Sequence, residues 1–150
     1  MRQLIDIVWL AGLLEGEGCF GLYKTPTIRV GMTDFDVIEK VRTIFDVTSA
    51  ISISSNENST IPSKVPVFQT MIYGKNAIEL MKEVLPYMGQ RRTQKILEII
   101  SEYETKMEYK KNFCKRGHDL NVSENVRYKE NGYRVCKLCD KVLYEMKREA

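Results

Sequence analysis

The segment Leu10–Gly18, with the sequence LAGLLEGEG, constrains the fold of this chain more than any other stretch. It overlaps an apolar run over Ile7–Leu14, and the pattern predicts a buried helix over residues 5–17, which Gly18 ends. Gly12 and Gly16 lie inside that helix, where each glycine costs about 1 kcal/mol relative to alanine. Because they are four residues apart, they share one face and expose a strip of backbone that a second helix can approach closely.

Two carboxylates crowd the end of the same helix. Glu15 and Glu17 stand in its last turn, where the helix macrodipole disfavours negative charge. A sequence that accepts this penalty predicts a functional use for the carboxylates. A divalent cation would offset the repulsion, because hard cations prefer carboxylate oxygens.

The patterning after this helix predicts an α+β fold in which strand pairs alternate with helices. The first elements expected are a hairpin of Cys19–Lys24 and Thr27–Met32 and a helix capped by Asp34. Strands should follow over Val47–Ser54 and Val65–Tyr73, separated by a loop at 55–64. The last elements are a helix capped by Asn76 and stopped by Pro86, and a long helix over Arg91–Lys106. In the last helix the inward positions are predicted to be Ile96, Leu97, Ile99 and Ile100.

The charged stretch Glu102–Lys111 is interpreted as a helix end running into a linker. Composition changes after it, so we predict a core domain over residues 1–110 and a small module over 111–150.

The nine-residue segment resembles the LAGLIDADG motif of homing endonucleases, position by position. Matching residues are Leu10, Ala11, Gly12, Leu13 and Gly18, while Leu14, Glu15, Gly16 and Glu17 replace isoleucine, aspartate, alanine and aspartate. The resemblance extends over about residues 4 to 105, through the predicted αββαββα order and the stretch around Leu85–Met88. It implies a site-specific endonuclease of double-stranded DNA that works as a homodimer.

The same resemblance assigns roles to individual residues. The motif helices of two copies would pack together through Gly12, Leu13 and Gly16. Glu17 would bind the catalytic Mg²⁺. Arg91 would be the basic catalytic residue, at a place where the family usually has lysine.

The predicted sheet offers a face for DNA. Strand alternation, with Ile51 and Ile53 assigned to the core, turns several polar side chains outward, and a β-ribbon of this kind fits the major groove. We predict DNA contacts from Arg29 above all, and from Arg92 beside the sheet. The other predicted contacts from this part of the chain are Tyr23, Thr27, Ser52, Gln69 and Tyr73.

The last third of the chain carries a metal-ligand pattern. Cys114 and His118 are followed, after a seventeen-residue spacer, by Cys136 and Cys139. Three thiolates and one imidazole predict a closed tetrahedral zinc site that holds a segment too small to fold on its apolar residues alone. The turn signal Asn131-Gly132 predicts a hairpin between residues 126–128 and 133–135, and a short helix should follow over 141–149.

A knuckle, a hairpin and a helix in this order resemble a treble-clef zinc finger of the kind appended to mobile-element nucleases. Catalytic members of that finger group need a free histidine as general base. His118 is the only histidine in the sequence, and it is predicted to be a zinc ligand. We therefore predict a structural Zn²⁺ and an accessory role, with Arg116 and Arg134 among the residues that contact DNA phosphates.

Composition bounds the remaining possibilities. The chain is 43% hydrophobic and 29% charged with a net charge of +3, which is typical of a globular protein and favours nucleic acid only weakly. The clustered cysteines and the lack of a signal peptide or membrane-length apolar run predict a reducing, cytoplasmic location and no membrane partner. Alternatives that stay open are a non-catalytic DNA-binding regulator, an RNA-binding intron maturase, and a zinc-stabilised protein-interaction module.

Overall fold

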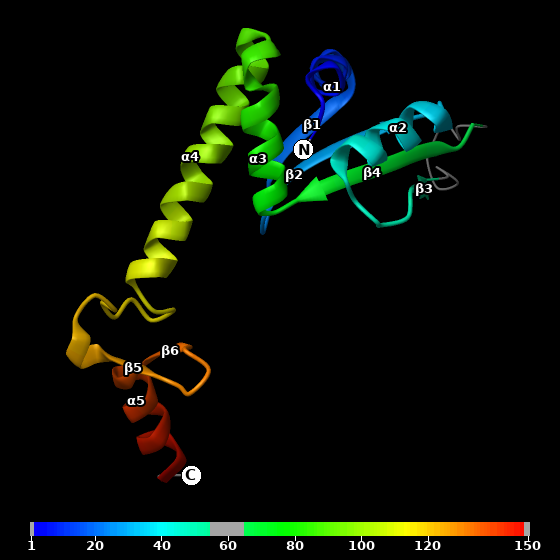
Figure 1. Cartoon of the computed structure of the whole chain (residues 1–150). Coiled ribbons are helices and arrows are strands. Elements are labelled where there is room, and N and C mark those ends of the chain that lie inside the picture. The colour runs from blue at the N-terminus through cyan, green and yellow to red at the C-terminus, as the bar shows by residue number, and fades with distance from the viewer. Residues whose placement is uncertain (1, 55–64, 149–150) are drawn as a thin grey trace, which may run out of the picture. The chain divides into compact units, whose positions relative to one another are not determined.

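The computed structural model describes residues 2–54 and 65–148 (Figure 1). The chain divides into two compact units, Met1–Tyr103 and Glu104–Ala150. One long helix, Gln90–Asn112, belongs to both units, and the boundary predicted from composition at residue 110 also falls within it. The charged stretch Glu102–Lys111, predicted to be a helix end that runs into a linker, is helical throughout.

The first unit has the predicted αββαββα order. Its elements are α1 (Leu4–Glu17), β1 (Gly18–Leu22), β2 (Pro26–Met32), α2 (Phe35–Phe45), β3 (Ser52–Ser54), β4 (Val67–Tyr73), α3 (Lys75–Val84), the 3₁₀ turn η1 (Leu85–Tyr87) and the start of α4 (Gln90–Asn112). The four strands pair antiparallel in the order β1-β2-β4-β3. This arrangement confirms the predicted fold class of the core.

One face of the sheet is buried beneath the helices. Phe20, Ile28, Val30 and Ile72 point to this face and join a core with residues of α1, α2, α3 and α4. Alternate residues of the same strands point the other way, because successive strand side chains face opposite sides of a sheet. The sheet therefore has one apolar, covered face and one open face.

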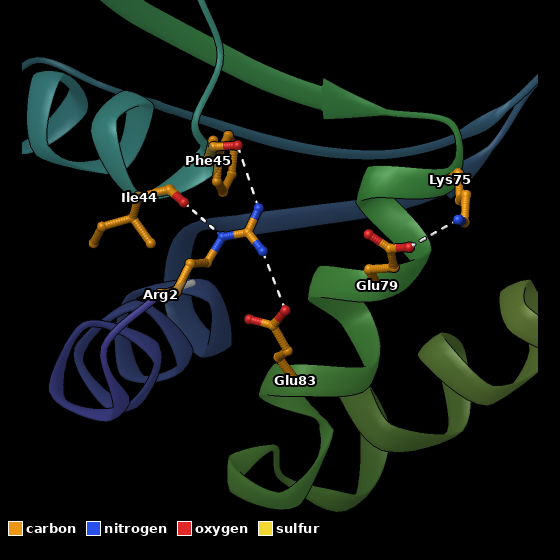
Figure 2. A network of polar contacts seen from close by, with 6 residues as sticks. All are labelled: Arg2, Ile44, Phe45, Lys75, Glu79 and Glu83. Atoms are coloured by element: carbon orange, nitrogen blue, oxygen red, sulfur yellow. Dashed lines mark hydrogen bonds and ion pairs between the residues drawn. The ribbon is translucent and has the colours of Figure 1, made fainter.

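Arg2 ties the start of α1 to two other helices (Figure 2). Its Nε donates to the Ile44 carbonyl at 2.7 Å and its Nη2 to the Phe45 carbonyl at 3.4 Å, at the C-terminal end of α2. Its Nη1 pairs with the Glu83 carboxylate on α3 at 3.1 Å. A positive charge at a helix C-terminus is favourable, so this one side chain both caps α2 and joins three helices.

Several predicted boundaries in the first unit are wrong. The strand predicted over Val47–Ser54 is only the three residues of β3, and Ile53, predicted to be in the core, is 65% exposed. β3 is an edge strand that pairs with the first residues of β4, so this side chain lies at the border of the sheet. The loop predicted over 55–64 lies outside the described residues.

The helices differ in smaller ways. α3 begins at Lys75 with Gly74 rather than Asn76 at the N-cap, and Gly74 has a φ of 71°, which glycine adopts at little cost. Leu97, predicted to point inward, is 50% exposed, whereas Ile96, Ile99 and Ile100 are buried. The buried residues repeat at helical spacing, and Leu97 falls outside the resulting stripe.

The second unit contains the predicted hairpin and helix. After the end of α4 come the 3₁₀ turn η2 (Ser123–Asn125), β5 (Val126–Tyr128), β6 (Arg134–Cys136) and α5 (Lys137–Arg148). Gly132 takes a φ of 78° in the turn between the strands, as the Asn-Gly signal predicts. α5 starts directly after Cys136, four residues earlier than the predicted helix.

Candidate functional sites

The end of α1 presents one unpartnered carboxylate. Glu17 is the last residue of α1 and is exposed, and within residues 2–54 and 65–148 its side chain has no hydrogen-bond or ion-pair partner. Arg91, in the first turn of α4, is also exposed and without such a partner in the same ranges. Both side chains predicted to be catalytic are thus available to an outside ligand.

Glu15, in contrast, is held by the start of α4. Its carboxylate accepts a hydrogen bond from the Gly89 N–H at 3.0 Å, next to the N-terminus of α4, where negative charge is favoured. A Cβ on Gly89 would lie 3.1 Å from this carboxylate, so glycine permits the close approach. The Gly89 N–H therefore offsets the unfavourable position of the Glu15 carboxylate at the end of α1. Glu17 has no such partner among the described residues and is the carboxylate that would still need a cation.

Arg92 caps the same end of α1. Its Nε and Nη2 donate to the Glu15 carbonyl at 3.2 and 3.1 Å, and Nη2 also lies 3.5 Å from the Gly16 carbonyl. A guanidinium at a helix C-terminus satisfies carbonyls that have no partner within the helix. Arg92, predicted to contact DNA, is directed at the backbone of α1 in this structure.

One side of α1 is apolar and open. Ile7, Leu10, Ala11 and Leu14 are buried and Leu13 is half-buried against the core, but Leu4, Ile5 and Val8 are 68%, 73% and 46% exposed. The prediction that the whole helix is buried is thus wrong for this side. Gly12 and Gly16 are also exposed, and nothing lies within 4 Å of the place where a Cβ would stand on either. The open side of α1 is therefore a flat strip with no partner in the described residues.

The open face of the sheet gathers the residues predicted to contact DNA. In the strand register Thr27 faces Tyr73, and Ser52 faces Gln69, so these four share a face. Arg29, on the same face, stands between Cys19 and Met71. A hollow of about 210 Å³ on this face is lined by Cys19, Gly21, Tyr23, Thr27, Arg29 and Met71.

Met71 is a member of this face that the sequence analysis missed. It is 39% exposed and stands between Gln69 and Tyr73 in the strand alternation. The alternation alone places it outward, whereas its apolar character hides it from a search for polar residues. The face is thus less polar than the predicted set.

Three thiols and one imidazole converge in the second unit. His118 Nδ1 lies 3.4 Å from Cys114 Sγ, 3.5 Å from Cys136 Sγ and 3.4 Å from Cys139 Sγ. All four ligand atoms lie within 4.8 Å of one another. In a tetrahedral zinc site the bonds of about 2.3 Å to sulfur and about 2.0 Å to nitrogen separate neighbouring ligand atoms by roughly 3.5 to 3.8 Å. The cluster therefore has the dimensions of a zinc site, and its donor set fits Zn²⁺.

The turn before His118 prepares Cys114 for a metal. Gly117 has a φ of 80°, and the turn directs the N–H groups of Arg116 and His118 at Cys114 Sγ, at 3.4 and 3.3 Å. Desolvation alone would raise the pKa of Cys114, but these N–H groups and the neighbouring thiols lower it to about 6.

Cys139 responds in the opposite direction. Desolvation, then hydrogen bonds and charge repulsion from Cys114 and Cys136, raise the pKa of the Cys139 thiol to about 11. Three thiolates do not coexist easily at this spacing without a cation between them. The positive charge of a divalent metal ion offsets this repulsion and keeps the coordinated thiols deprotonated.

Side-chain contacts brace the rest of the module. Arg127 donates to the Asp140 carboxylate through Nε at 2.9 Å and Nη2 at 2.6 Å, joining β5 to α5. The Asn125 amide donates to the Asp119 carbonyl at 2.9 Å. Of the two arginines predicted to contact DNA, Arg116 is exposed, and Arg134 is exposed but donates to the Lys111 carbonyl in the last turn of α4.

These features define a mixed helix-and-sheet protein with an αββαββα core and a small module built around three cysteines and a histidine. No protein-family model and no curated protein matches the chain by sequence. No helix in residues 2–54 and 65–148 is long and apolar enough to cross a membrane.

The solved structures to which the chain is similar include two complexes of the homing endonuclease I-CvuI. One holds the I-CreI target with magnesium and uncleaved DNA. It is 14% identical, with a TM-score of 0.43 over 63% of this chain and 64% of that one. The other holds the enzyme's own target with calcium. It is 15% identical, with a TM-score of 0.46 over 73% of this chain and 71% of that one.

Proposed function

We propose that this protein is a site-specific endonuclease of double-stranded DNA that works as a homodimer. The observation that carries the proposal is the end of α1. There Glu17 is exposed and has no partner among the described residues, while Glu15, two residues away, accepts a hydrogen bond from the N–H of Gly89. The chain therefore keeps one carboxylate available at the position where the LAGLIDADG motif places its metal-binding residue.

The open side of α1 supports the proposed homodimer. The exposed strip formed by Leu4, Ile5, Val8, Gly12 and Gly16 is apolar and flat enough for the same strip of a second copy to pack against it. A twofold axis at the glycines would bring two Glu17 side chains together. One chain supplies only one such carboxylate, so the site would be completed by the partner.

The chemistry expected at Glu17 is hydrolysis of a phosphodiester bond. When bound, Mg²⁺ supplies an activated water and stabilises the leaving oxygen. Glu17 fits this ion because it offers hard oxygen ligands at an exposed position. Arg91 would stabilise the negative charge that develops on the phosphate.

The open face of the sheet would bind the duplex. Arg29 and Gln69 are suited to read base edges in the major groove, while Thr27, Ser52, Tyr73 and Tyr23 would contact bases or backbone at its border. A homodimer would double this surface and favour a nearly palindromic target.

In the second unit a structural Zn²⁺ would be held by Cys114, His118, Cys136 and Cys139. Arg116 would add a phosphate contact from this module.

A second candidate is a protein that binds nucleic acid on the same surface without cleaving it, either a DNA-binding regulator or an RNA-binding maturase. The observation that favours it is Arg91, which stands where the family resemblance implies lysine. Arginine stays charged and does not transfer protons as readily as lysine.

The two candidates are separated by incubating the full-length protein with Mg²⁺ and a library of duplexes from its own genomic flanks and sequencing the ends, while binding of the same duplexes and of the matching RNA is measured in parallel. Enrichment of one cleavage position, lost with a chelator and in Glu17→Gln, supports the nuclease. Selective binding of one duplex with no new ends would replace it with the regulator, and selective binding of RNA with the maturase.

A further inference from the structure

A groove of about 850 Å³ lies beside the zinc-type cluster, entirely within the second unit. The last turns of α4 contribute Tyr109 and Lys110, and the turn that carries Cys114 contributes Lys115. The hairpin contributes Tyr133 and Arg134. Cys114 and Cys136 also line the groove, but none of the roles proposed above uses its tyrosines or lysines.

The two tyrosines of the groove are exposed. Tyr109 and Phe113 stack with their centroids 5.0 Å apart and their planes at 24°. Tyr109 is nevertheless 51% exposed, and Tyr133 is 73% exposed. Aromatic rings are ordinarily buried in a small module, because they are its largest source of apolar area. Rings left at the wall of a groove are suited to stack against a flat partner.

The charged side chains that line the groove are all positive among the residues that the structure describes. They are Lys110, Lys115 and Arg134. Arg134 also donates to the Lys111 carbonyl, which fixes this cation at the wall. A flat ligand that is also negatively charged therefore complements the groove better than a neutral aromatic one.

We propose that this groove binds a single strand of nucleic acid, with an unpaired base on the aromatic rings and the flanking phosphates on the three cations. Stacking platforms combined with a basic groove are the usual means of binding unpaired strands. A duplex does not offer the same contact, because its bases are stacked on one another inside the helix. This site is additional to the nuclease proposed above and does not depend on its cleavage activity.

The test uses the full-length, zinc-loaded protein and labelled oligonucleotides of one sequence as single-stranded DNA, single-stranded RNA and duplex DNA, followed by fluorescence anisotropy. Tyr133→Ala should weaken single-strand binding about fivefold or more, because one base–aromatic stack is lost, and should leave duplex affinity unchanged. Tyr133→Phe should keep the wild-type affinity, since the ring remains. Whichever single strand depends more on Tyr133 identifies the sugar that the groove prefers.

A matched control is Tyr144→Ala, which removes a tyrosine that is 64% exposed on α5 but does not line the groove. It should change neither affinity. Zinc content and circular dichroism should be equal in all variants, because both tyrosines are exposed. The proposal would be overturned if wild-type protein bound no single strand, or if Tyr133→Ala left single-strand binding intact or weakened single-strand and duplex binding equally.

Discussion

The Arg92 guanidinium donates two hydrogen bonds to the carbonyl oxygen of Glu15, at 3.2 and 3.1 Å, across 77 residues of sequence. The Glu15 carboxylate in turn accepts from the Gly89 N–H. The positive charge of Arg92 thus lies at the C-terminus of α1, and the negative charge of Glu15 lies at the start of α4, so each charge stabilises the helix end that it contacts. These contacts fix the helix end that carries Glu17 without using Glu17 itself.

Arg92→Ala should lower the free energy of unfolding of the first unit by about 1 to 2 kcal/mol. The change removes hydrogen bonds from a charged donor and a favourable charge at a helix C-terminus. Arg91→Ala is the matched control, since Arg91 is exposed and unpartnered in the described residues, and its stability should equal that of the wild type. Urea denaturation measures both. Equal stabilities of the two variants would mean that the Arg92 contacts contribute nothing.

Glu17→Gln should reduce cleavage by orders of magnitude while DNA binding persists. The substitution keeps the size of the side chain but removes the charge that would hold Mg²⁺, and the sheet face is unchanged. Stability should be equal or slightly higher, because a negative charge leaves a helix C-terminus. Initial cleavage rates and gel-shift affinities, measured side by side, check this.

Glu15→Gln provides the contrast to Glu17→Gln. It should lower stability by about 0.5 to 1 kcal/mol, since the Gly89 N–H loses a charged acceptor, and should affect cleavage much less. If Glu15→Gln abolished cleavage and Glu17→Gln did not, the metal-binding carboxylate would be assigned to the wrong residue.

Gly12→Leu should abolish the homodimer without unfolding the chain. The Cβ position of Gly12 meets open space within one copy, so the monomer accepts the side chain, and helix propensity improves by about 1 kcal/mol. In the proposed dimer the same side chain would hold the two helices apart. Glu39→Leu, which adds a leucine at an exposed position of α2, should leave assembly unchanged. Analytical ultracentrifugation that finds wild-type and Gly12→Leu proteins in the same state would contradict the proposed interface.

Zinc should be present at one atom per chain, and Cys136→Ser should remove it. Cys136 is buried and lies 3.5 Å from His118 Nδ1, so its loss breaks the ligand set of a module with few buried apolar residues. The core cluster of the first unit contains none of these ligands, so that unit should keep its cooperative unfolding. Metal analysis and heteronuclear NMR of both proteins test this. A folded second unit in zinc-free protein would show that the metal is dispensable.

The sequence by itself determined the order of the elements, the fold class of the core and the membership of the Cys–His cluster. Each depends on local information: the period of apolar residues decides between helix and strand, Asn131-Gly132 specifies a turn, and the cysteine spacing specifies a ligand set. Glu17 was singled out in the same way, because its motif is contiguous.

Tertiary structure alone decided which surfaces are covered and which side chains meet. Glu15 and Glu17 look alike in the sequence, yet only Glu15 is bound, because the packing of α4 brings Gly89 and Arg92 to it from more than seventy residues away. The apolar period of α1 predicts burial, but the rest of the chain covers only one side of the helix. The groove with Tyr109 and Tyr133 exists only because the end of α4 and the hairpin meet around the zinc-type cluster. Contacts between distant residues depend on how elements pack, because the apolar period of an element shows which of its faces is buried but not which partner covers that face.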